Sequence, residues 1–160
     1  MTSRMGCHIR YDPEADVALL SFTESSRSGG VALDFDDDSG LAGLLRLGAG
    51  GEFDHLELLG ARRAIPQLVT GLNAPPSGVR DYCRGVVNVH LAAGDEQGAV
   101  RFDLVDISAD GGEYEISVRA KSSPSVLATL TYDINTGALR SLTLFPVGNL
   151  LQGIPGITSD

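Results

Sequence analysis

The fold of this chain is decided near its start, by the stretch HIRYDPEADVALLSF at residues 8–22. Residues that favour strands stand on both sides of a short acidic turn that contains a proline. Pro13 suits the second position of a type I turn, and Asp12 before it can accept a local backbone hydrogen bond. The stretch therefore predicts a β-hairpin at the N-terminal end of the chain.

Short strand-like runs continue along the chain, separated by turns that are rich in glycine. The clearest run is residues 114–119 (YEISVR), in which apolar and polar residues alternate as in an antiparallel strand with one buried face. The remaining expected strands are 31–35, 41–47, 53–59, 86–91, 100–105, 127–133 and 138–145. Helix is confined to a turn or two within 62–70 and one within 149–153. This pattern predicts an all-β protein with little helix, an antiparallel barrel or sandwich.

The length of 160 residues predicts a single domain over 1–160. A glycine- and proline-rich loop, residues 71–78, divides the chain into halves at 6–66 and 84–147. We predict two pseudo-repeated β-meanders, because LDFDDDSGL at 33–41 is echoed by LTYDINTGAL at 130–139. Unrelated hairpins can share such a sequence pattern, so the similarity is explained either by duplication or by coincidence. Paired into one sheet, the two meanders would share one interior.

Composition and charge restrict the class of partner. Twelve basic residues against twenty-one acidic ones give a net charge of −9, which opposes nucleic-acid binding because phosphates need clustered Lys and Arg. No apolar run has the length of a membrane span, so a membrane partner is not expected. The two cysteines, Cys7 and Cys83, form no CxxC motif. They are expected to be small buried residues in a reducing compartment, which points to the cytoplasm.

The N-terminal half resembles a bacterial family named domain of unknown function 2283. Family members open on I-x-Y-D-P-E-A-D, which stands here as IRYDPEAD at residues 9–16. Their closing motif corresponds more weakly to residues 50–62, and the usual Leu-Tyr pair is Ala18-Leu19 here. The resemblance covers about residues 8–65. It implies a small β-rich unit, makes an antitoxin-like role conceivable, and transfers no catalytic residue.

Metal and cofactor sites find little support in the sequence. The acidic run at 34–40 fails as an EF-hand loop, because Ser39 and Leu45 stand where glycine and glutamate are required. His8, His55 and His90 have no metal-ligand spacing. We therefore expect no metal ion and no cofactor, and we interpret the acidic run as a solvated turn.

No catalytic nucleophile can be identified, because the chain has neither a GxSxG elbow nor a recognisable Cys-His spacing. Three of the four tyrosines, Tyr11, Tyr114 and Tyr132, lie on the apolar faces of expected strands. If the interior is hollow, their hydroxyls face the lumen and could bind a ligand. If it is filled, they are core aromatics, and catalytic residues remain unknown in either case.

Two functions follow from these observations. The first is a non-catalytic binding protein, regulator- or antitoxin-like, with a protein partner. The alternative is a small β-barrel cyclase or isomerase that orients a small hydrophobic ligand in its lumen without metal or cofactor. A homodimer is compatible with both. A large cavity bordered by the tyrosines would favour the enzyme, and a filled interior with an exposed apolar patch would favour the binding protein.

Overall fold

The chain folds almost entirely into strands. The computed structural model describes residues 3–22, 30–36, 42–70, 83–93, 98–104, 112–120 and 125–154. In chain order, the elements are β1 Ser3–Asp12, β2 Val17–Ser21, β3 Gly30–Asp36, β4 Ala42–Gly48, β5 Phe53–Leu59, α1 Ala61–Ala64, α2 Pro66–Thr70, β6 Cys83–Ala93, β7 Val100–Leu104, β8 Glu113–Arg119, β9 Val126–Asp133, β10 Leu139–Leu144 and the 3₁₀ turn η1 Leu150–Gly153. The expected strands and the scarcity of helix are therefore confirmed.

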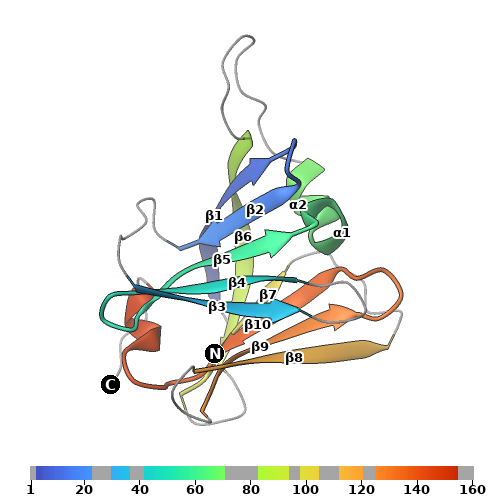
Figure 1. Cartoon of the computed structure of the whole chain (residues 1–160). Helices are drawn as coiled ribbons and strands as arrows, with labels where there is room; N and C mark the ends of the chain where they lie inside the picture. Colours follow the sequence, from blue (N-terminus) through green and yellow to red (C-terminus); the bar gives the residue numbers. More distant parts are fainter. Residues whose placement is uncertain are drawn as a thin grey trace.

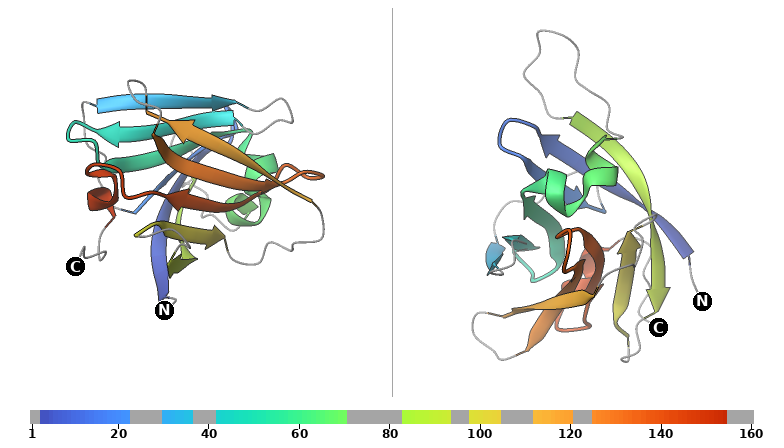
Figure 2. Two further views of the ribbon diagram at one scale, coloured as in Figure 1. Left: turned by 90° about the horizontal axis from the view of Figure 1, so that it is seen from below. Right: turned by 90° about the vertical axis from the view of Figure 1, so that its right-hand side faces the viewer.

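The ten strands form one antiparallel sheet, in the order β3-β4-β5-β2-β1-β6-β7-β10-β9-β8. The sheet folds over on itself, so that its two edge strands β3 and β8 lie near each other (Figure 1). No hydrogen-bonded ladder joins these two strands in the part of the chain described. The closed barrel is therefore wrong, and the fold is an open antiparallel sandwich whose layers can be followed in Figure 2.

The two halves of the chain repeat one strand order. From the central β1–β6 pair outward, the first half runs β1-β2-β5-β4-β3 and the second runs β6-β7-β10-β9-β8. Each half is a hairpin followed by a three-stranded meander whose last strand returns beside the hairpin. This is a Greek-key connection rather than a simple meander.

The pairing register repeats as well as the order. Leu20 of β2 pairs with Leu56 of β5, and in the second half Phe102 of β7 pairs with Leu142 of β10. The register equates β9 with β4 and β8 with β3, so the sequence echo between 33–41 and 130–139 does not join equivalent strands. The loop at 71–78 lies outside the described residues.

Each half also contains a β-bulge at the second residue of its last strand. The pairing of β4 with β5 shifts at Asp54, and the pairing of β9 with β10 shifts at Arg140. A bulge inserts one unpaired residue and bends the strand. Both bulge residues are charged, and both are buried.

The halves share one hydrophobic core. The cluster of buried side chains includes Ile9, Leu45 and Leu58 from the first half and Phe102 and Leu130 from the second. The rings of Phe22 and Phe102 stack across the two halves with centroids 4.4 Å apart. Removal of this apolar surface from water stabilises both halves together.

The opening hairpin turns as its sequence predicts. The Asp12 carboxylate accepts hydrogen bonds from the backbone N–H groups of Glu14 and Ala15. Asp16 then adopts a left-handed conformation with φ of 56°. Its carboxylate accepts from the Tyr11 hydroxyl at 2.8 Å and from the N–H of Arg62 at 2.9 Å. The acidic turn is thereby tied to the first helical turn of α1.

Candidate binding face

The three predicted ligand-binding tyrosines do not meet at one place. Tyr11 is buried and donates its hydroxyl to Asp16 in the first half. Tyr132 is buried in the second half, with its ring centroid 6.0 Å from that of Tyr114. Tyr114 lies on the edge strand β8 and is 49% exposed. The structure therefore brings two of these residues together, and one of the two faces solvent.

The interior contains a small apolar cavity of about 20 Å³. Its lining comes from both halves: Cys7, Leu20, Phe22, Phe53, Leu56, Phe102, Leu139 and Leu142. This volume is about that of one water molecule, whereas a substrate pocket measures several hundred cubic ångströms. The cavity has none of the three tyrosines in its wall. Among the described residues, this cavity has neither the volume for a substrate nor a polar group to bind one.

Cys7 lies in the wall of this cavity and is 1% exposed. Burial away from water raises the pKa of its thiol to about 12. The thiolate is the reactive form of cysteine. Cys7 is therefore a small apolar core residue, as the sequence predicts for it, and the side chain of Cys83 lies outside what the structure describes.

The bulge in β5 brings two neighbouring polar side chains together. Nδ1 of His55 lies 2.7 Å from Oδ2 of Asp54. Side chains that are adjacent in a regular strand point to opposite faces, so this pair depends on the bulge. The imidazole is half-buried and the carboxylate is buried. Such a pair fixes the orientation of the imidazole ring.

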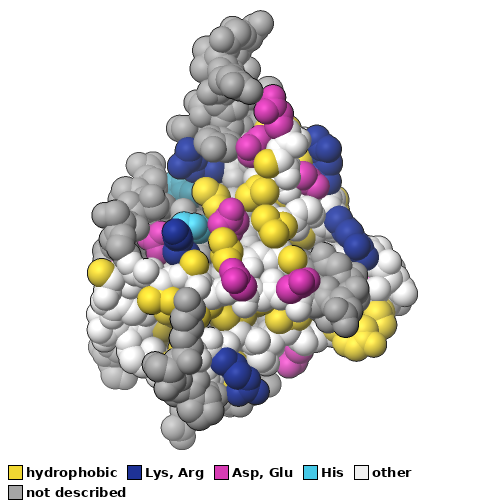
Figure 3. Space-filling view, viewed as in Figure 1, with side chains coloured by type: hydrophobic (Ala, Val, Ile, Leu, Met, Phe, Trp, Pro, Cys, Tyr) yellow, Lys and Arg dark blue, Asp and Glu magenta, His cyan; other side chains and the backbone are white. Residues whose placement is uncertain are grey.

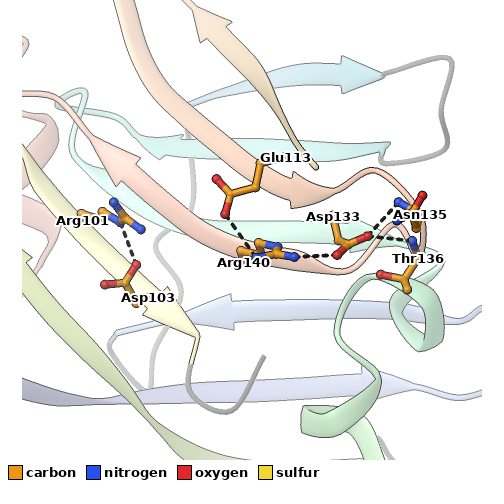
Figure 4. A network of polar contacts seen from close by, with 7 residues as sticks. All are labelled: Arg101, Asp103, Glu113, Asp133, Asn135, Thr136 and Arg140. Atoms are coloured by element: carbon orange, nitrogen blue, oxygen red, sulfur yellow. Dashed lines mark hydrogen bonds and ion pairs between the residues drawn. The ribbon is translucent and has the colours of Figure 1, made fainter. Parts of the chain in front are cut away.

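The second bulge holds a buried ion pair (Figure 4). Nη2 of Arg140 donates to Asp133 at 2.6 Å and its Nη1 donates to Glu113 at 3.2 Å. Asp133 also accepts from the N–H groups of Asn135 and Thr136, which closes the β9–β10 turn. The hydrogen bond from Arg140, with these backbone hydrogen bonds, lowers the pKa of Asp133 below its ordinary value. Asp133 thus holds the turn, and Arg140 connects Asp133 to Glu113 of β8.

Metal ligands do not gather in the described part of the chain, where no three His, Cys, Asp or Glu side chains converge. Asp34 and Asp36 of the acidic run are exposed on β3, and residues 37–41 lie outside the described residues. His8 and His55 lie on different strands, and the side chain of His90 is outside the description.

A surface of mixed apolar and acidic side chains covers the outer side of the first half, over β2, β5, β4 and β3. One row of cross-strand neighbours is Leu19, Glu57, Leu44 and Asp34, and the next is Val17, Leu59, Ala42 and Asp36. We call these eight residues the acidic apolar face. Figure 3 shows hydrophobic and acidic side chains interleaved on this side of the molecule. Leu59 is 45% exposed, and Val17, Leu19 and Leu44 are half-buried.

The second half provides an internal comparison for this face. The repeated register equates the row Leu19, Glu57 and Leu44 with the row Arg101, Thr143 and Thr129. The same backbone arrangement therefore folds with polar side chains at these positions. The leucines of the first half are not required by the architecture, and an apolar surface without a structural reason is a candidate for binding.

The sequence pattern contained a signal for this face. Residues 17–20 and 41–47 are apolar at nearly every position, and that pattern is typical of strands covered on both sides. In the structure, the inner residues of β2 and β4, such as Leu20 and Leu45, are buried, while the outer ones remain partly open to solvent. The sequence pattern did not indicate that the second apolar side of β2 and β4 is an outer surface.

Comparisons with protein-family models, curated proteins and solved structures found no match for this chain. The resemblance of its N-terminal half to domain of unknown function 2283 stays a prediction. Among the described residues, no helix has the length and apolar character needed to cross a membrane.

Proposed function

We propose that this protein is a non-catalytic binding protein, regulator- or antitoxin-like, which holds a protein partner against the acidic apolar face. One observation carries the proposal: Leu19 and Leu44 occupy positions at which the second half of the same fold has Arg101 and Thr129. Partly exposed leucines at positions that tolerate polar residues suit the apolar centre of an interface.

The interior supports the same proposal. Its cavity of about 20 Å³ is apolar and has the size of one water molecule. The alternative function, a cyclase or isomerase acting in a lumen, gains no support from a cavity of this size. The buried thiol of Cys7 agrees with our placing the protein in the cytoplasm, where cysteines stay reduced.

The test replaces Leu19 and Leu44 by the residues that stand at the equivalent positions of the second half, Arg101 and Thr129. A random peptide library displayed on phage is selected against the wild-type protein, and the enriched peptides are measured against Leu19→Arg/Leu44→Thr. We expect the variant to keep its cooperative unfolding and to lose at least about tenfold in peptide affinity, because truncation of central apolar anchors costs this much. The control Thr129→Ser changes the matching row of the second half and should bind as the wild type does. Equal binding by all three proteins, or a selection without enrichment, overturns the proposal.

A further inference from the structure

The centre of the acidic apolar face contains a carboxylate between two leucines. Glu57 of β5 pairs with Leu19 on one side and with Leu44 on the other. Its side chain is half-buried. Within the described part of the chain, the Glu57 carboxylate has no hydrogen bond or ion pair. Arg10 of β1 lies in the same row on the far side of Leu19 and has an interaction of its own, whereas Arg46 and His55 lie in the next row.

Those neighbouring cations do not neutralise Glu57. His55, two residues earlier on β5, is engaged by the carboxylate of Asp54 at 2.7 Å. Arg46 pairs with His55 across the strands and is exposed. No ion pair joins Arg46 to Glu57 among the described residues. The face therefore presents a negative charge that is available to a molecule docking on it.

Resting on the proposed function, we infer that the partner docks a segment in which a Lys or Arg stands between two apolar residues, with the cation on Glu57 and the apolar residues on Leu19 and Leu44. A purely apolar partner would strip water from the Glu57 carboxylate without replacing its interactions, and an unpaired buried charge is strongly unfavourable. A cation at the same place restores those interactions and gives the contact its specificity.

A second copy of this chain fits the face poorly. In a two-fold dimer the same surface meets itself. If the two-fold axis passes through the centre of the face, the Glu57 carboxylates of the two copies face each other, and neither is neutralised by a cation of its own chain among the described residues. Like charges facing each other in an interface are repulsive, so the occupant is a different protein whose charge is opposite.

The spacing of the row indicates an amphipathic helix as the docking segment. Leu19 and Leu44 lie on strands that flank β5, so they are about two strand spacings, roughly 10 Å, apart. Residues seven apart on an α-helix are separated by about 10 Å, and the residue three or four positions along lies between them on the same side. The expected motif is thus an apolar residue, a Lys or Arg three or four positions later, and a second apolar residue at the seventh.

The experiment uses peptides selected from the same phage-displayed library against the wild-type protein. Their affinity is then measured for two matched charge variants. Glu57→Gln removes the carboxylate at the centre of the face, whereas Glu115→Gln removes an exposed carboxylate from β8 in the second half. We expect selected peptides to contain the apolar–cation–apolar motif, to lose about tenfold in affinity for Glu57→Gln, and to bind Glu115→Gln as they bind the wild type. Affinity for the wild type should also fall as salt concentration rises.

The other outcomes separate the two proposals. Peptides that lose affinity for Leu19→Arg/Leu44→Thr but lack a basic residue and tolerate Glu57→Gln would overturn the inferred chemistry and leave the binding face in place. Peptides indifferent to both variants would overturn the binding face itself. A dimer in sedimentation equilibrium that Leu19→Arg/Leu44→Thr dissociates would show that a second copy covers the face, and would overturn the inference of a cationic partner.

Discussion

At the scale of single residues, the equivalent β-bulges of β5 and β10 contain side chains of opposite charge. Asp54 and Arg140 occupy the same position in the repeated register, yet one is an acid and the other a base. Each lies against an oppositely chargeable neighbour, His55 at 2.7 Å and Asp133 at 2.6 Å. A buried charge that loses such a neighbour is strongly unfavourable, so each bulge residue depends on its neighbour.

The first prediction concerns Asp133→Asn, which removes the carboxylate beside Arg140. Since Arg140 holds the pKa of Asp133 below its ordinary value, the ionised carboxylate stabilises the fold above the unfolded-state pKa of about 3.9. This contribution is lost as the pH falls through the lower folded-state pKa. Urea unfolding should therefore show Asp133→Asn less stable than the wild type at neutral pH, with the difference shrinking in acid below about pH 4.

The exposed pair Arg101–Asp103 supplies the control for that measurement. Nε of Arg101 lies 2.7 Å from Asp103 (Figure 4), but the two side chains are 54% and 33% exposed. Surface pairs contribute about 0–1 kcal/mol. Asp103→Asn should leave the urea midpoint nearly unchanged. An equal loss in both variants would mean that the burial of Arg140 adds nothing to its pairing.

At the scale of elements, the acidic turn and α1 act as one unit. Asp16 accepts hydrogen bonds from Tyr11 and Arg62, and its backbone carbonyl accepts the N–H of Ala61. On the other side of α1, Nε of Arg63 donates to the carbonyl of Thr136 in the β9–β10 turn. A helix of four residues therefore joins turns from both halves of the chain.

The second prediction tests this unit at Asp16. Asp16→Ala removes an acceptor of two hydrogen bonds and places alanine at a positive φ, which should cost about 2 kcal/mol in the free energy of unfolding. Asp16→Asn keeps one carbonyl oxygen and tolerates the left-handed conformation, so it should cost less than about 1 kcal/mol. Chemical denaturation measures both. Equal losses would show that the charge, and not the hydrogen-bond geometry, matters at this turn.

At the scale of the whole molecule, local patterns predicted the strands better than their arrangement. The alternation around Ile116 and the Asp12-Pro13 pair report local backbone preferences. The strand and the turn that they predict were both confirmed, although Tyr114 on the expected apolar face is exposed. The open edge between β3 and β8 and the return of β5 beside β2 depend on pairings distant in sequence, which no local pattern encodes. The bulges at Asp54 and Arg140 break the two-residue period and so were missed.

The candidate site was predictable only in part, for a similar reason. Apolar residues at Leu19 and Leu44 signal a strand with two apolar sides. The sequence does not say whether the second side meets another layer or solvent. That distinction required the layer order, together with the polar row at Thr129 and Thr143, which shows what the same architecture tolerates.

The last prediction addresses whether the two halves unfold together. Phe102 of β7 is 2% exposed, stacks on Phe22, the residue directly after β2, and lines the central cavity. Phe102→Ala should cost about 3–5 kcal/mol in the free energy of unfolding. Since one core serves both halves, hydrogen exchange followed by mass spectrometry should become faster in core strands β5 and β10 alike. The control Ile134→Ala removes a side chain that is 39% exposed and should change stability by no more than about 0.5 kcal/mol. If exchange accelerates in the second half alone, the halves are independent folding units and the shared core does not couple them.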